Sequence, residues 1–124
     1  MEKEFIGCKE SKQLEELGFD EECLGHYKQG GLIHILHYGI CGSKKSDSFN
    51  TLAPLYQQAF KFFRDKYKMY GQITIAEFEH INESFEYEIK TNDKSIDTWR
   101  GGYKTYEEAE KECLNKLIEL CTKN

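Results

Sequence analysis

Cysteine and histidine side chains, which hold zinc in many proteins, gather in the first third of the chain. The set comprises Cys23, His26, His34, His37 and Cys41. Its spacing matches no standard zinc finger or zinc ribbon. His34 and His37 fall in a segment typical of a β-strand, where residues three apart point to opposite faces. We therefore predict no metal site and no cofactor.

A second set of polar residues lies on one face of a predicted central helix. Lys61, Arg64 and Lys68 recur at helical spacing, and a tryptophan beside a glycine pair follows further along the chain. Cations bind phosphate groups, and an indole ring can stack on a base. We predict a site for a small anionic ligand such as a nucleotide, formed by Lys61, Arg64, Lys68, Trp99, Arg100 and Lys104. The alternative is that the three helical cations are simply the solvated face of the helix.

The sequence contains no motif that indicates catalysis. No serine lies in a G-x-S-x-G sequence, and neither a phosphate-binding loop nor a dinucleotide fingerprint is present. No cysteine stands at a predicted helix N-terminus, where the pKa of its thiol would be lowered. We predict that the protein is not an enzyme.

The hydrophobic pattern predicts the elements that would position these residues. In chain order they are a short helix over 11–18 with Ser11 as N-cap, a turn or short helix over 19–27, a strand over 32–38, a polar loop over 41–50, a helix over 54–70, strands over 73–78, 85–90 and 96–103 joined by a turn over 80–84, and a helix over 105–121.

Both long helices carry an apolar face and recognisable ends. The central helix has Pro54 at its first position, Gly71 after its last, and an apolar stripe at Tyr56, Ala59, Phe60, Phe63, Tyr67 and Tyr70. The last helix begins with a capping box, Thr105 with Glu108, and its stripe comprises Tyr106, Ala109, Cys113, Leu117 and Leu120. We predict an α+β fold in which two main helices pack on one face of a small antiparallel sheet, with a short N-terminal helix and an added edge strand.

Length and composition set the outer limits. A chain of 124 residues predicts a single domain, 1–124, with a less regular region over 1–50 and a helix–strands–helix core over 51–124. We find no apolar run long enough to span a membrane and no secretion signal. An odd count of five cysteines, with Cys113 and Cys121 on a helix stripe, fits core thiols in a reducing cytoplasm.

The order of elements from 53 to 121 matches that of a double-stranded RNA-binding domain. That module grips phosphates with lysines at the start of its second helix. Here these positions are Glu107, Glu108 and Glu110, and the net charge of the chain is −5. Nucleic acid is therefore a disfavoured partner.

Three segments resemble small uncharacterised proteins of phages and mobile elements in Bacteroides-type bacteria. They are 17–23 (LGFDEEC), 53–67 (APLYQQAFKFFRDKY) and 102–119 (GYKTYEEAEKECLNKLIE). In that group the first segment often has proline before its cysteine, where this chain has Glu22. The resemblance implies an accessory protein that acts in the cytoplasm of a bacterial host cell, and it transfers no catalytic residue.

We therefore expect a non-enzymatic, phage-encoded protein that sequesters a small anionic ligand, such as a nucleotide signal, or blocks a host defence factor. One alternative is a protein–protein adaptor or homo-oligomer that uses the surplus of tyrosine and phenylalanine as its interface. A second is a nucleic-acid-binding regulator. No membrane partner is expected.

Overall fold

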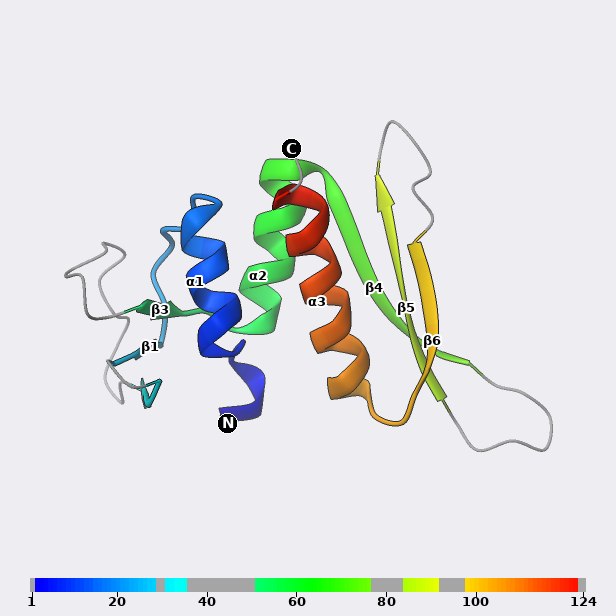
Figure 1. Cartoon of the computed structure of the whole chain (residues 1–124), viewed down its shortest axis with the longest axis horizontal. Helices are drawn as coiled ribbons and strands as arrows, with labels where there is room; N and C mark the ends of the chain where they lie inside the picture. The colour runs from blue at the N-terminus through cyan, green and yellow to red at the C-terminus, as the bar shows by residue number, and fades with distance from the viewer. Residues whose placement is uncertain (1, 29–30, 36–50, 77–83, 92–97, 123–124) are drawn as a thin grey trace. The chain divides into compact units, whose positions relative to one another are not determined.

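The computed structural model describes residues 2–28, 31–35, 51–76, 84–91 and 98–122 (Figure 1). They form an α+β protein, as predicted, with three α-helices and two three-stranded antiparallel sheets. The chain divides into two compact units, Met1–Ala59 and Phe60–Asn124. The assignment of 1–124 as one domain stays a prediction. No helix in the described ranges is long and apolar enough to cross a membrane.

The first unit contains the short turn η1 (Glu2–Glu4), the helix α1 (Cys8–Glu16) and the strands β1 (Gly25–Tyr27), β2 (Ile33–Ile35) and β3 (Thr51–Ala53). The strand order is β2-β1-β3. Tyr27 helps to hold the sheet to the N-terminal segment, because its hydroxyl donates a 2.6 Å hydrogen bond to the carbonyl of Ile6. The buried apolar residues of this unit include Phe5, Ile6, Leu14, Phe19, Cys23, Leu52, Ala53, Pro54 and Ala59.

The predicted N-terminal helix is present as α1, but its start was wrong. Gly7 is the N-cap, and its carbonyl already accepts the N–H of Ser11 at 2.8 Å, so Ser11 lies inside the helix and is buried. Cys8 is the first helical residue, which also corrects the expectation that no cysteine begins a helix. Gly18, with φ of +103°, follows the helix as predicted, because glycine adopts this conformation without steric cost.

The predicted edge strand joins a different sheet from the one expected. Its described part, β2, pairs with β1, and β1 pairs with β3. Two strands therefore lie where none was predicted. β1 falls in the segment 19–27, which was predicted as a turn or short helix, and β3 covers the three residues before the predicted central helix. A partner nearby in sequence closes a shorter loop than the distant sheet would require, and short loops cost less entropy. The predicted loop over 41–50 lies outside the described residues.

The second unit holds three long strands, β4 (Met69–Ala76), β5 (Ser84–Thr91) and β6 (Thr98–Tyr103), in that spatial order (Figure 1). All three match predicted strands, although β4 begins four residues early. In β5, Tyr87 and Ile89 are buried while Lys90 is exposed, as the alternating pattern predicts. The turn predicted over 80–84 lies outside the described residues, apart from Ser84 at the start of β5.

The central helix is shorter and less regular than its stripe suggested. α2 covers Tyr56–Phe62, and the π-helical segment η2 (Phe63–Tyr67) continues it. Pro54 precedes the helix instead of beginning it, and the N–H of Leu55 is capped by the side-chain oxygen of Gln58 at 3.0 Å. Lys68, not Gly71, ends the helix, so Tyr70 belongs to β4. Ala59 and Phe63 of the predicted stripe are fully buried.

The last helix, α3 (Tyr106–Thr122), packs against all three strands of the second sheet. The hydroxyl of Thr105 accepts the N–H of Glu108 at 3.1 Å, which confirms the predicted cap. The carboxylate of Glu108 accepts the N–H of Lys104 instead of that of Thr105, at 3.2 Å. Ala109, Cys113 and Leu117 of the predicted stripe are buried, but Tyr106 remains 45% exposed.

Gly71 lies where the side chains of two helices come closest to the sheet. A Cβ atom at this position would lie 2.9 Å from Sγ of Cys113, 3.1 Å from Phe60 and 3.2 Å from Leu117. A larger residue here would force these side chains to shift, so Gly71 provides space and does not, as the sequence suggested, end a helix.

Candidate functional site

Three of the six predicted ligand-binding residues act electrostatically on one carboxylate of the second unit, that of Asp65. Lys61 Nζ lies 2.8 Å from Oδ2 of Asp65, one helical turn away. This hydrogen bond lowers the pKa of Asp65 below its ordinary value, and the charges of Lys61, Arg64 and Lys68 act in the same direction. These three cations therefore favour the ionised form of Asp65. We call Lys61, Arg64 and Lys68 the η2 cation cluster.

Lys66 is a further cation of η2 that the sequence pattern did not indicate, and its contacts are with aromatic rings. Its ammonium group lies 5.6 Å from the ring centre of Phe62 and 5.5 Å from that of Tyr67. Cation–π contacts of this kind hold a long side chain along an aromatic surface. The spacing of Phe62 and Lys66, four residues apart in a helix, is the signal that could have revealed the contact.

The backbone of Lys68 has an unusual conformation. It is the only non-glycine residue with positive φ in the described ranges, at φ 56° and ψ 37°. Its N–H closes the helix by donating to the carbonyl of Phe63. Glycine or asparagine is usual at such a helix end, and a lysine there costs on the order of 1 kcal/mol. Strained residues and π-helical turns both concentrate at functional sites.

The other three predicted residues belong to a different part of the second unit. Arg100 is exposed on β6, and β5 separates that strand from β4, which follows the η2 cation cluster. Lys104 is exposed in the turn before α3. Trp99 faces Glu88 in the strand register, but its side chain lies outside the described part of the structure. The structure thus gathers Lys61, Arg64 and Lys68 and places Arg100 on the opposite edge strand.

Arg100 has aromatic neighbours of its own. It pairs in register with Tyr87, whose ring stacks on that of Tyr103 with centroids 6.0 Å apart. Burial raises the pKa of Tyr87 to about 12, and the charge of Arg100 opposes that shift. Both phenols therefore stay protonated at neutral pH, and neither is suited to act as a base.

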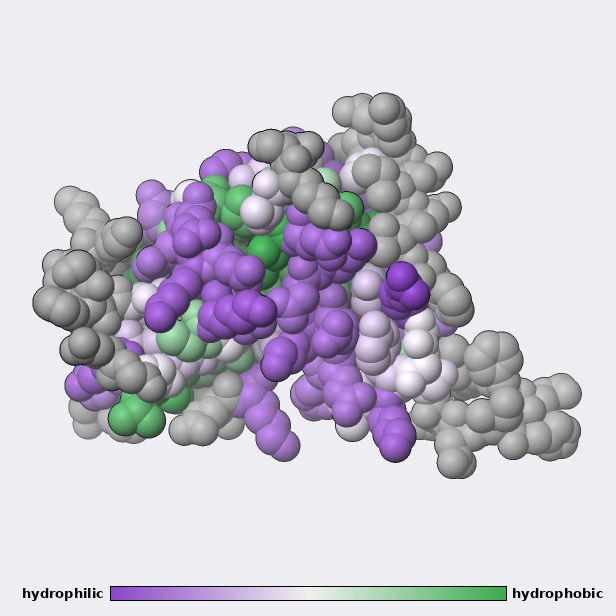
Figure 2. Space-filling model, viewed as in Figure 1, coloured by the Kyte–Doolittle hydropathy of each residue, from purple (hydrophilic) through white to green (hydrophobic). Residues whose placement is uncertain are grey.

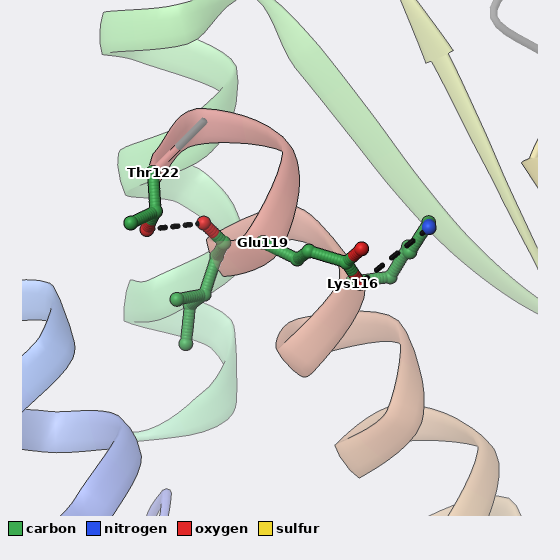
Figure 3. A network of polar contacts seen from close by, with 4 residues as sticks. Lys116, Glu119 and Thr122 are labelled. Carbon is green, nitrogen blue, oxygen red and sulfur yellow. Dashed lines mark hydrogen bonds and ion pairs between the residues drawn. The ribbon is translucent and has the colours of Figure 1, made fainter. Parts of the chain in front are cut away.

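The outer face of α3 is acidic. Figure 2 shows hydrophilic residues over the part of this helix that faces the viewer. The exposed side chains include Glu107, Glu108, Glu112 and Glu119, against Lys111. Close to its C-terminus, Lys116 Nζ lies 3.5 Å from the Glu119 carboxylate, and the hydroxyl of Thr122 donates to the carbonyl of Ile118 at 2.7 Å (Figure 3). This face would repel phosphate groups.

The thiols of α3 are poorly suited to nucleophilic chemistry. Burial raises the pKa of Cys113 to about 12 and that of Cys121 to about 11. A thiol becomes a strong nucleophile only after deprotonation. Both cysteines are buried in the core, as predicted.

The ionised form of Glu110, on α3, is disfavoured in the folded protein. Burial, followed by the charge of Glu107, raises the pKa of Glu110 from its ordinary 4.5 to about 6. Because the folded state holds the proton more tightly, this group favours folding below pH 4.5 and loses that contribution as the pH rises through 6. Glu110→Gln should therefore raise the free energy of unfolding by about 1 kcal/mol near neutral pH, after discounting for solvent screening.

The gain from Glu110→Gln should vanish near pH 4.5, where the native carboxyl group is itself protonated. Urea denaturation of both proteins at the two pH values measures this. An equal gain at both would show that charge burial is not the cause.

Comparison of the chain with protein-family models, curated proteins and solved structures found no match.

Proposed function

We propose that this protein is a non-enzymatic binding protein that sequesters a small anionic ligand, such as a nucleotide signal, on the η2 cation cluster. The observation that carries the proposal is that Lys61 lies 2.8 Å from Asp65 and that the charges of Lys61, Arg64 and Lys68 all act on that carboxylate. A phosphate group and a carboxylate attract the same cations, so the place filled by Asp65 indicates where a phosphate would lie.

The Lys61–Asp65 pair is weak enough to exchange for an external ligand. Both side chains are well exposed, at 59% and 64%. Exposed ion pairs contribute little to stability, because water screens them and the long side chains lose entropy. A phosphorylated ligand can therefore take Lys61 from Asp65 at small cost.

The packing of the second unit supports an outward-facing cluster. We propose that α2 with η2 and α3 cover one face of the sheet, because a Cβ atom on Gly71 would meet both Phe60 of α2 and Leu117 of α3. The helix bearing the cations then presents its polar side to solvent. The resemblance to phage proteins fits this role in the cytoplasm of a bacterial host, since stoichiometric capture needs no catalytic centre.

Calorimetric titration with nucleotides and cyclic oligonucleotides tests the proposal. Lys61→Gln, Arg64→Gln and Lys68→Asn should each weaken binding about tenfold, the value of one hydrogen bond to a charged group. Asparagine at 68 tolerates the left-handed backbone, so that variant removes the charge without adding strain. Lys116→Gln removes a cation from α3 and should leave the affinity unchanged.

Asp65→Asn provides the opposite effect. The amide no longer competes for Lys61 or repels phosphate, so the affinity should rise about fivefold. Loss of binding in Asp65→Asn would contradict the proposal, as would the absence of heat with every ligand in the panel.

A second candidate, a protein–protein adaptor or homo-oligomer, rests on an apolar patch at one end of the sheet. Ile75 is 55% exposed and pairs in register with Phe85, whose ring meets that of Tyr106 edge-on at 6.1 Å. Light scattering distinguishes the two, because an adaptor of this kind should associate and Ile75→Lys should abolish association. The acidic start of α3 disfavours the nucleic-acid-binding alternative.

A further inference from the structure

His26 and His34 form a pair that the sequence did not reveal. β1 and β2 run antiparallel, and their register places His26 directly opposite His34. Residues opposite each other in an antiparallel pair project from the same face of the sheet. The two imidazole rings have centroids 5.1 Å apart and planes tilted by 46°. The other histidine close to His34 in sequence, His37, lies outside the described residues.

The separation of the two rings suits a shared metal ion. Imidazole nitrogens bind Zn²⁺ at about 2.0–2.1 Å, so two rings on one tetrahedral ion have centres about 5 Å apart. His34 is exposed, which gives an ion access from solvent, while His26 is half-buried and more constrained. Imidazole is also a preferred ligand of Ni²⁺ and Cu²⁺.

We propose that His26 and His34 together bind one divalent transition-metal ion, each through one ring nitrogen, with water completing the coordination. No group of three or more metal-binding side chains occurs in the described ranges. The proposed site therefore has two protein ligands, and its affinity is below that of a closed structural zinc site. The bound ion links β2 to β1 and stabilises a sheet whose strands are each only three residues long.

Titration of the untagged protein with Ni²⁺ tests the proposal, with Mg²⁺ as a control ion that prefers oxygen ligands. One Ni²⁺ should bind per chain, and Mg²⁺ should not. His34→Gln should weaken Ni²⁺ binding at least about tenfold, because a single imidazole remains. His26→Gln should have the same effect. If its half-buried position prevents folding, the exposed His34 variant decides the outcome.

Two results would overturn the proposal. One is an unchanged Ni²⁺ affinity in His34→Gln. That variant keeps His37, His80 and all five cysteines, so residues among these would then be the ligands. The other is the absence of Ni²⁺ binding to the original protein.

Amide hydrogen exchange in β1 and β2 provides a second measurement. An ion bound far from these strands would leave their exchange rates unchanged. Ni²⁺ should slow exchange in Gly25–Tyr27 and Ile33–Ile35 of the original protein, because the link suppresses local opening of this sheet. In His34→Gln the same concentration of Ni²⁺ should leave those rates unchanged. Slowing of equal size in both proteins would contradict the proposed ligands.

Discussion

Replacing Phe63 by alanine should lower the free energy of unfolding by about 3–5 kcal/mol, the usual range for a buried phenylalanine. Phe63 is completely buried, and its ring lies 5.4 Å from that of Phe62 and 5.9 Å from that of Tyr67. Truncation removes apolar contacts and leaves a cavity that its rigid neighbours fill only in part. Chemical denaturation gives the free energy directly.

The matched control for Phe63→Ala is Tyr106→Ala, which truncates a partly exposed ring of the same unit. Its cost should be about 1 kcal/mol, mainly from the lost edge-on contact with Phe85. Similar losses for the two variants would show that Phe63 is not a core residue. Phe63 also begins η2, and its carbonyl accepts the N–H of Lys68.

Gly71→Ala should lower the free energy of unfolding by about 1–3 kcal/mol, although alanine normally stabilises a strand relative to glycine. The new methyl group would lie 2.9 Å from Sγ of Cys113, closer than atoms of this size approach. A stabilised Gly71→Ala protein would show that the strand and the helices are farther apart than described.

The double mutant Gly71→Ala, Cys113→Ala tests whether a clash with Cys113 causes the loss of stability in Gly71→Ala. Cys113→Ala removes the sulfur atom and makes room for the methyl group. In the Gly71→Ala background this second change should recover part of the lost stability, with a coupling of about 0.5–3 kcal/mol. Simple additivity would point to backbone strain instead of a clash.

The elements that the sequence predicts well are those whose sequence patterns lie within the element itself. α3 begins where Thr105 and Glu108 form a cap, and β5 follows an alternation of apolar and charged residues that is typical of a strand with one wet face. These features depend on neighbouring residues, so one sequence suffices to find them.

The elements that were predicted wrongly depend on distant partners. Three residues such as 51–53 contain too little pattern to indicate a strand, and β3 exists because it pairs with Gly25–Tyr27. Tyr70 fits helical spacing by coincidence, since a residue on the following strand can have the same spacing. The left-handed Lys68 carries no glycine signal, so the end of η2 could not be located.

The candidate site was predictable in the same uneven way. Lys61, Arg64 and Lys68 recur at helical spacing in the sequence, and Asp65, on which all three charges act, lies four residues after Lys61. The separation from Arg100 depends on the order of strands in the sheet, which single-sequence patterns do not determine. The pairing of His26 with His34 likewise depends on register between strands.

Anion binding by the η2 cation cluster is tested by a two-dimensional NMR titration with the tightest-binding nucleotide from the calorimetric panel. Amide signals of 61–68 should move in proportion to occupancy, while those of Arg100 on β6 should not. The combined variant Lys61→Gln, Arg64→Gln and Lys68→Asn should show no movement. Shifts centred on Ile75 and Tyr106, or shifts that persist in the combined variant, would contradict an anion-binding η2 cation cluster.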